Sequence, residues 1–229
     1  MKKLLSITIL LVIGFCAVAT ARHNKNPLMA SDTVVWAGLD YSMVRMIGTN
    51  DFQIPDMIFP GMLEKWNQLF LDERIESLAK TLRKNVAIDI GAVSDRNKTA
   101  TAAQIILTAD SKDVVKESHI SQQDIAAEVQ FYKLSKTSGL GLVFIVDRFV
   151  HRVVCPPSRL AAHDRVGLNR ARDEEYSSCG AVYVVFFDVA TREIISSDRD
   201  LSCINTGANF RNFWFGVIKN ADKNLDKYR

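Results

Sequence analysis

The sequence has none of the short motifs that identify common enzyme classes. It contains no Gly-x-Gly-x-x-Gly nucleotide-binding loop, no Gly-x-Ser-x-Gly nucleophile turn and no His-Glu-x-x-His zinc motif. It also has no Cys-x-x-Cys pair, so nothing supports a dithiol redox enzyme. Internal repeats and low-complexity segments are absent as well. The sequence is therefore that of a globular chain, and no motif in it identifies an activity.

The first 21 residues have the order of a secretory signal peptide. Lys2 and Lys3 precede an apolar run from Leu4 to Phe15, and the small residues Ala19-Thr20-Ala21 follow. The run is shorter than the roughly 20 residues that span a bilayer, and no second apolar segment offers a transmembrane helix. We expect cleavage after Ala21 and export to the periplasm or the outer membrane.

Cys16 raises the alternative of a bacterial lipoprotein, in which a lipid is attached to a cysteine at the cleavage site. Such sites usually have a small residue before the cysteine, whereas here the bulky Phe15 precedes it. We therefore do not expect lipidation. Residues 22–32 are polar and read as a flexible lead-in to a domain that begins at Thr33.

The mature chain has almost no net charge. Cleavage removes two lysines and leaves 27 basic and 26 acidic residues, a net charge of +1. A general nucleic-acid binder carries a basic excess, so this function class is excluded. The remaining 208 residues, in a chain that is 48% hydrophobic, suffice for one sizeable core.

Three cysteines remain after cleavage, and export makes one disulfide plausible. Cys155 and Cys179 flank an irregular segment, so we expect the bridge between them, with Cys203 left over. In the chain-entropy model such a bridge contributes about 3 to 4 kcal/mol.

Apolar periodicity predicts an alternation of strands and helices. Strand candidates are 33–39, 42–47, 86–91, 139–150, 181–189 and 193–198; helices are expected over 60–84, from Ser121 to about Lys136, and from about Phe210 to Leu225. Residues 102–107 fit either helix or strand. Ser121-Gln-Gln-Asp124 approximates a capping box at a helix start. The segment from His151 to Cys179 is an irregular insert.

This order predicts a single α/β (α+β) sandwich with a mixed sheet of about four to six strands, flanking helices and a C-terminal antiparallel hairpin. The run from Ala181 to Phe187 is apolar at every position, which is typical of a central strand covered on both faces. Asp188 to Glu193 then has the residues of the hairpin turn.

Two segments carry a resemblance. Gly139-Leu-Gly-Leu-Val-Phe-Ile-Val146 with Val182-Tyr-Val-Val-Phe-Phe-Asp-Val-Ala-Thr-Arg-Glu193, and the later Phe210-Arg-Asn-Phe-Trp214, resemble uncharacterised exported proteins of gut Gram-negative bacteria. The order of elements also looks like the α/β domain of envelope lipoproteins of the curli-secretion and penicillin-binding-protein-activator types. The first resemblance covers residues 33–226 and implies an exported protein. The second concerns the architecture only, and an analogy of fold assigns no function.

Asp147, His151 and Cys155 are the most suggestive catalytic set, in the pattern of a cysteine hydrolase. Along a strand, however, Asp147 and His151 lie roughly 13 Å apart, which excludes a direct hydrogen bond. We interpret them as polar groups at a strand end. Asp188 beside Thr191 is likewise better explained as a turn cap than as a catalytic base.

A metal site from His151, Cys155, His163 and Cys179 has suitable donor atoms, but the spacings match no compact zinc pattern. We expect no metal and no other cofactor.

The insert and its flank are rich in arginine: Arg148, Arg152, Arg159, Arg165, Arg170 and Arg172. Guanidinium groups match phosphate and carboxylate groups, so these residues are the candidate contact surface for an anionic envelope surface or an acidic partner. The alternative is a solvated loop, partly neutralised by Asp173-Glu-Glu175.

The aromatic stripe Phe210, Phe213, Trp214 and Phe215 has helical spacing, which favours core packing over a partner or membrane patch. Phe215 lies off the main stripe and is the residue that an exposed patch would include. Taken together, the sequence predicts an exported, non-catalytic binding or envelope-assembly domain. The alternative is an envelope hydrolase of unrecognised type that uses a carboxylate such as Asp147 or Asp188 as its base.

Overall fold

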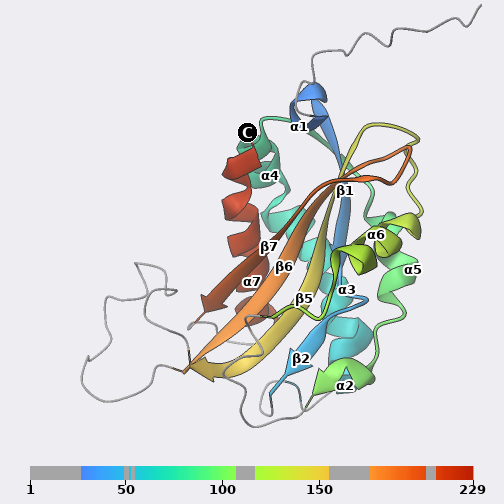
Figure 1. Cartoon of the computed structure of the whole chain (residues 1–229). Helices are drawn as coiled ribbons and strands as arrows, with labels where there is room; N and C mark the ends of the chain where they lie inside the picture. The colour runs from blue at the N-terminus through green and yellow to red at the C-terminus, as the bar shows by residue number, and fades with distance from the viewer. Residues whose placement is uncertain are drawn as a thin grey trace, which may run out of the picture.

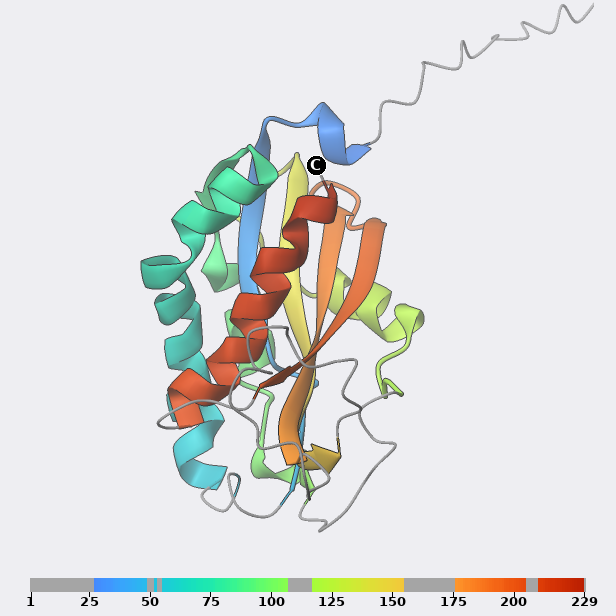
Figure 2. The same ribbon diagram turned by 90° about the vertical axis from the view of Figure 1, so that its left-hand side faces the viewer.

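The structure is a computed structural model, and it describes residues 27–48, 52, 55–106, 117–154, 176–204 and 210–228. Its centre is one seven-stranded sheet with helices on both faces (Figures 1 and 2). The strands are β1 (Thr33–Asp40), β2 (Arg45–Ile47), β3 (Asn85–Ile88), β4 (Ile105–Ile106), β5 (Leu140–Val154), β6 (Tyr176–Asp188) and β7 (Ile194–Ile204).

β5 is the strand around which the sheet is organised. One side of β5 is shared by two parallel partners: β1 pairs with its first half, from Leu140 to Ile145, and β2 with its second half, from Arg148 to Val150. β3 extends the sheet beyond β1, and β4 extends it beyond β2. On the other side, β5, β6 and β7 form an antiparallel meander. The sheet is therefore mixed, as the sequence predicts.

The helices are α1 (Pro27–Ala30), α2 (Pro55–Met57), α3 (Leu63–Glu73), α4 (Ile75–Leu82), α5 (Ser94–Asn97), α6 (Gln122–Gln130) and α7 (Phe210–Lys223). Shorter turns are η1 (Ile58–Met62), η2 (Ile90–Val93), η3 (Ala102–Gln104) and η6 (Asn224–Tyr228). None of the helices in the described ranges is long and apolar enough to cross a bilayer.

The two faces of the sheet bury different kinds of side chain. The face under α3, α4 and α7 holds a large aromatic core, in which Trp36 stacks on Phe70 and Phe149 packs against Trp66 and Trp214. The face under α6 holds a smaller, mainly aliphatic core. We call these the α7 face and the α6 face. Figure 2 shows α7 in front of the sheet and α6 beyond it.

β6 is apolar at every position from Ala181 to Phe187, where both faces of the sheet are covered. Val184 and Phe186 point into the core of the α7 face, whereas Val185 and Phe187 point into that of the α6 face. This arrangement confirms the prediction of a central strand buried on both sides.

A bulge ends the regular part of β1. The pairing with β5 shifts between Trp36 and Gly38, and Gly38 has a φ of +113°, which a residue with a side chain rarely adopts. A Cβ at this position would lie 2.6 Å from Asn67 Oδ1. The amide of Asn67 is that close because it donates to the carbonyl of Leu39 and accepts from its N–H.

The structure differs from the sequence predictions at several boundaries. The sheet has seven strands rather than four to six because residues 105–106, in the segment that fits either helix or strand, add the short strand β4 beside β2. The extended segment expected over 42–47 is strand only at Arg45–Ile47, and the helix expected to reach Lys136 ends at Gln130. Of the insert expected from His151 to Cys179, the first four residues belong to β5 and the last four to β6, and residues 155–175 lie outside the described residues.

The first 26 residues, which include the proposed signal peptide and Cys16, lie outside the described residues. Within the segment expected as a flexible lead-in, residues 27–30 form the one-turn helix α1. Leu28 of this helix is buried against the core of the α7 face.

Candidate functional site

A pocket of about 420 Å³ lies on the α6 face of the sheet, beside the segment that connects β1 to β2. In open α/β sheets, ligands bind beyond the carboxyl ends of parallel strands, and this pocket has that position relative to β1. Its lining comes from the β1–β2 connection, η3, β4 and the start of α6: Met43, Val44, Arg45, Ala103, Gln104, Ile106, His119, Ile120 and Asp124. We call it the β2 pocket.

The wall formed by residues 41–44, between β1 and β2, is fixed by side chains from other elements. Asp40 Oδ1 accepts from the N–H of Ser42 at 2.8 Å, and Gln104 Nε2 donates to the carbonyl of Ser42 at 2.6 Å. The ring of His119 lies with Nε2 2.8 Å from the carbonyl of Met43. Because these backbone groups have partners, the wall is held in place without a ligand.

A β-bulge places the two charged residues behind the pocket on one face of the sheet. Before the bulge, Phe144 and Val146 point to the α7 face and Ile145 to the α6 face. The pairing of β5 with β6 shifts between Val146 and Arg148, and Phe149 then points to the α7 face. The bulge thus turns successive charged side chains, those of Asp147 and Arg148, toward the α6 face.

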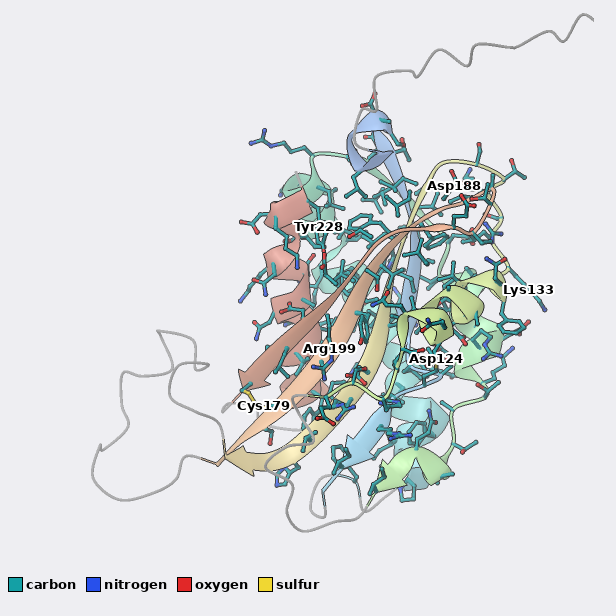
Figure 3. All side chains as sticks on the ribbon, viewed as in Figure 1. Asp124, Lys133, Cys179, Asp188, Arg199 and Tyr228 are labelled. Atoms are coloured by element: carbon teal, nitrogen blue, oxygen red, sulfur yellow. A yellow bond between two sulfur atoms is a disulfide. The ribbon has the colours of Figure 1, made fainter. Side chains whose placement is uncertain are left out.

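Asp147 is fully buried and binds three basic side chains. Its Oδ2 accepts from Arg199 Nε at 2.7 Å and from Arg148 Nε at 3.3 Å, and its Oδ1 lies 2.9 Å from His119 Nδ1. We call these four residues the Asp147 cluster. It joins β5, β7 and the segment before α6. Figure 3 labels Arg199 on β7.

The Asp147 carboxylate is stabilised in its charged form. Burial alone would raise its pKa, but His119, Arg148 and Arg199 together keep the pKa below its ordinary value. A carboxylate in this setting is a permanent anion that anchors cations and a poor general base.

His119 joins the Asp147 cluster to the pocket. Its Nδ1 faces the Asp147 carboxylate and lies 3.4 Å from Arg148 Nη2, and its Nε2 faces the Met43 carbonyl. The ring therefore connects the Asp147 cluster to the pocket wall.

Arg45 adds a cation to the pocket. It is in register with Arg148 on the adjacent strand, so two like charges lie side by side. Burial lowers the pKa of Arg148, Asp147 opposes that effect, and the charges of Arg199 and Arg45 add to it. Unlike Arg148, Arg45 is exposed. The repulsion between them leaves a favourable position for an anion.

A second buried network lies deeper under α6. Tyr132 Oη donates to Asp40 Oδ2 at 2.6 Å, Ser42 Oγ donates to Glu128 Oε1 at 3.2 Å, and Arg96 binds both oxygens of Glu128. Burial, followed by the charge of Glu128, raises the pKa of Asp40 to about 6. Arg96 is half-buried and the other four groups are buried, and none of them lines the β2 pocket.

The structure places the arginines of the predicted contact surface in different settings. Arg148 is 4% exposed and bound to Asp147, so it does not belong to an exposed arginine surface, contrary to the expectation. Arg152 lies on β5, and its side chain is outside the described part. The remaining members lie outside the described residues: Arg159, Arg165, Arg170 and Arg172.

The disulfide expected between Cys155 and Cys179 is replaced by one between Cys179 and Cys203. β6 and β7 are antiparallel neighbours in which these two residues are direct cross-strand partners, and sequence proximity to an irregular segment could not reveal that register. Figure 3 shows the bridge near the end of the two strands. Cys155 lies outside the described residues.

The other predicted candidates have structural roles. Asp188 Oδ1 accepts from the N–H groups of Ala190 and Thr191 and closes the β6–β7 turn, as expected of a turn cap. His151 Nδ1 lies 3.3 Å from Ser178 Oγ, and Asp147 has other partners. Phe215, the residue that an exposed patch would include, is 1% exposed and packs with Trp214 in the core of the α7 face, which agrees with the core packing that the sequence favours.

The hypothetical metal site is not assembled. Cys179 is in a disulfide and so cannot be a thiolate ligand, while Cys155 and His163 lie outside the described residues. Within the described ranges, no group of three or more His, Cys, Asp or Glu side chains could hold a metal ion.

The residues that form the pocket, the Asp147 cluster and the network of Asp40 were not recognised as a site from the sequence. Asp40 gave one usable signal, since a carboxylate at the end of a predicted parallel strand often lies near a site. Arg45, His119 and Arg199 show no such signal in the sequence. The order of the strands and the bulge in β5 bring these residues near one another, and neither the strand order nor the bulge has a local sequence pattern.

Comparison with known proteins adds little to this geometry. No protein-family model and no curated protein matches the chain. Among solved structures, one described as a "putative neuraminyllactose-binding hemagglutinin homolog from Helicobacter pylori" matches with 13% identity and a TM-score of 0.28, over 87% of this chain and 83% of that one. A similarity at that level carries no argument about fold or function, so the function must be inferred from the site itself.

Proposed function

We propose that this protein is an exported, non-catalytic binding domain that captures a small ligand in the β2 pocket. The observation that carries the proposal is the pocket itself. Apolar walls from Met43, Ile106 and Ile120 meet a few polar groups, which is the usual composition of a small-molecule site. The wall is fixed in advance by hydrogen bonds from Gln104 and His119, which reduces the entropy lost on binding.

The carboxylates that a hydrolase would need support binding rather than catalysis. Asp147 is an ion-paired anion with a lowered pKa, and Asp188 caps a turn at the far end of the β6–β7 hairpin. A general base near neutral pH needs a raised pKa and access to its substrate, and the buried Asp147 has neither. The Asp188 carboxylate accepts from N–H groups of its own turn. The hydrolase alternative gains no support from either residue.

Export is supported by the disulfide. Cystines form and persist in oxidising compartments, and the N-terminal 21 residues have the order of a signal peptide. In this proposal, the arginine-rich segment that follows β5 provides a separate contact with an anionic envelope surface or an acidic envelope partner. The resemblance to exported proteins of Gram-negative bacteria is consistent with this compartment.

Binding is tested by blocking the pocket. Thermal unfolding of the mature chain, residues 22–229, is followed with a panel of small apolar and amphipathic compounds. Ala103 is exposed at the pocket wall, so Ala103→Trp fills the pocket; Ala190→Trp at the exposed β6–β7 turn is the matched control. Compounds that raise the Tm of the natural chain and of Ala190→Trp, but not of Ala103→Trp, support the proposal. Equal stabilisation of Ala103→Trp by every such compound contradicts it.

A further inference from the structure

The polar part of the β2 pocket has a distinct charge pattern. Arg45 enters from β2, and the ring of His119 is held at the wall between Asp147 and the carbonyl of Met43. Within the part of the chain that the structure describes, the Arg45 side chain makes no hydrogen bond and no ion pair. An exposed guanidinium that borders a pocket is a donor fork for two oxygen atoms.

A second arginine lies behind Arg45 on the neighbouring strand. Arg148 is the in-register neighbour of Arg45 and contributes to its surroundings from a buried position. Because Arg148 is buried, solvent screens the repulsion between the two guanidinium groups less than it would between two surface charges.

One carboxylate, that of Asp124 at the start of α6, also borders the pocket. Asp124 Oδ2 accepts from the N–H and the Oγ of Ser121, which completes the capping box of α6. Those bonds lower the pKa of Asp124, so it stays charged, and they hold its carboxylate at the helix start. The pocket is therefore cationic on the β2 side and apolar along Met43, Ile106 and Ile120.

We infer that the β2 pocket takes a small organic anion, in which a carboxylate or phosphate group binds Arg45 beside His119 and a short apolar body lies against Met43, Ile106 and Ile120. The inference rests on the proposed binding function and specifies its ligand class. An anion between Arg45 and Arg148 relieves their repulsion, and the fixed wall supplies the apolar contact. A neutral or cationic compound of the same size gains only the apolar part.

Titration calorimetry with five probes tests this inference on the mature chain: hexanoate, hexyl phosphate, hexanol, hexylamine and inorganic phosphate. We expect hexanoate or hexyl phosphate to bind at least about tenfold more tightly than hexanol, as one charge-assisted hydrogen bond implies. The anion that binds more tightly identifies carboxylate or phosphate as the head group of the ligand. Hexyl phosphate should also bind more tightly than inorganic phosphate, because only hexyl phosphate fills the apolar part of the pocket.

Two variants assign the effect to Arg45. Arg45→Gln should weaken binding of the preferred anion at least about tenfold. Arg45→Lys, which keeps the charge but loses the planar fork, should bind with intermediate affinity. Arg83→Gln removes an exposed arginine at the end of α4 and should leave affinity unchanged.

The outcomes separate this inference from the proposed function. If hexanol binds as tightly as the anions, or Arg45→Gln binds them unchanged, the anionic ligand class is wrong while the pocket stands. If inorganic phosphate binds as tightly as hexyl phosphate, the inference that the ligand has an apolar body is wrong. If no probe binds and no compound in the thermal panel distinguishes Ala103→Trp from Ala190→Trp, both the pocket and its ligand class fail.

Discussion

Two buried aspartates owe their environments to single-residue irregularities in strands. The bulge in β1 precedes Asp40 and the bulge in β5 contains Asp147, and both side chains consequently lie on the α6 face. Their electrostatic states nevertheless differ. Asp147 has three basic neighbours, whereas Asp40 has another carboxylate, Glu128, nearby. The same residue type is thus a fixed anion at one position and a group that titrates near pH 6 at the other.

Asp147→Asn should destabilise the protein by about 3 to 5 kcal/mol, because it removes the partner of two buried or half-buried guanidinium groups. Urea unfolding of the natural and substituted chains measures this difference. Asp95→Asn is the control, since Asp95 pairs with Lys98 and Lys133 at the exposed surface and should change stability little. Equal effects of the two substitutions would show that the Asp147 cluster does not hold β5 and β7 together.

Asp40 gives the protein a pH-dependent stability with a defined sign. Its pKa is raised from 3.8 to about 6 in the folded chain, so between these values the folded state keeps a proton that the unfolded state has lost. The free energy of unfolding should therefore fall as pH rises through this window, by roughly 2 to 3 kcal/mol, and change little from this group above it.

Asp40→Asn removes this titration. Urea unfolding of both chains at several pH values from about 4 to about 7 should show a smaller pH slope for the variant. Asp147 does not obscure the comparison, because its lowered pKa makes its contribution disappear only as pH falls below the ordinary aspartate range. Identical slopes for the two chains would exclude Asp40 as the titrating group.

At the level of elements, features that depend on neighbours in sequence were predictable and those that depend on neighbours in space were not. The capping box of Ser121 and Asp124, the turn closed by Asp188 and the two-sided burial of β6 follow from local patterns, and the structure confirms them. The division of one side of β5 between β1 and β2 was not predictable, because the order of strands leaves no trace in local periodicity. The pocket and the Cys179 partner both depend on that order and register.

The disulfide between β6 and β7 gives a direct chemical test of register. Peptide mapping of the oxidised, mature protein without reduction should recover one linked pair that joins the peptides of Cys179 and Cys203. Reduction should lower the free energy of unfolding by roughly 3 kcal/mol in the chain-entropy model, for a sequence separation of 24.

Cys155→Ser serves as the control for that experiment. The substituted protein should retain the linked peptides and the stability of the natural chain, since the bridge does not use Cys155. Recovery of a Cys155–Cys179 peptide, or loss of the linked pair in Cys155→Ser, would contradict the register of β6 and β7.

On the scale of the whole molecule, the two faces of the sheet differ in what they bury. The aromatic core around Trp36, Trp66 and Trp214 fills the described interior of the α7 face, so the role of that interior is packing. The α6 face combines an aliphatic core with the Asp147 cluster, the network of Asp40 and the β2 pocket. Buried charges are costly unless they are paired, and here they hold a pocket wall in place beside a cationic entrance.

The most direct test of this account is a nuclear magnetic resonance titration of the isotopically labelled mature protein with hexanoate and with hexyl phosphate. The account predicts that, with at least one of them, the largest shifts occur at the backbone amides of Arg45, Gln104 and Ile120 and at the Nε–H of Arg45, around the pocket on the α6 face. Shifts confined to α3, α4 and α7, or no saturable shift with either compound, would contradict the β2 pocket as an anion-binding site.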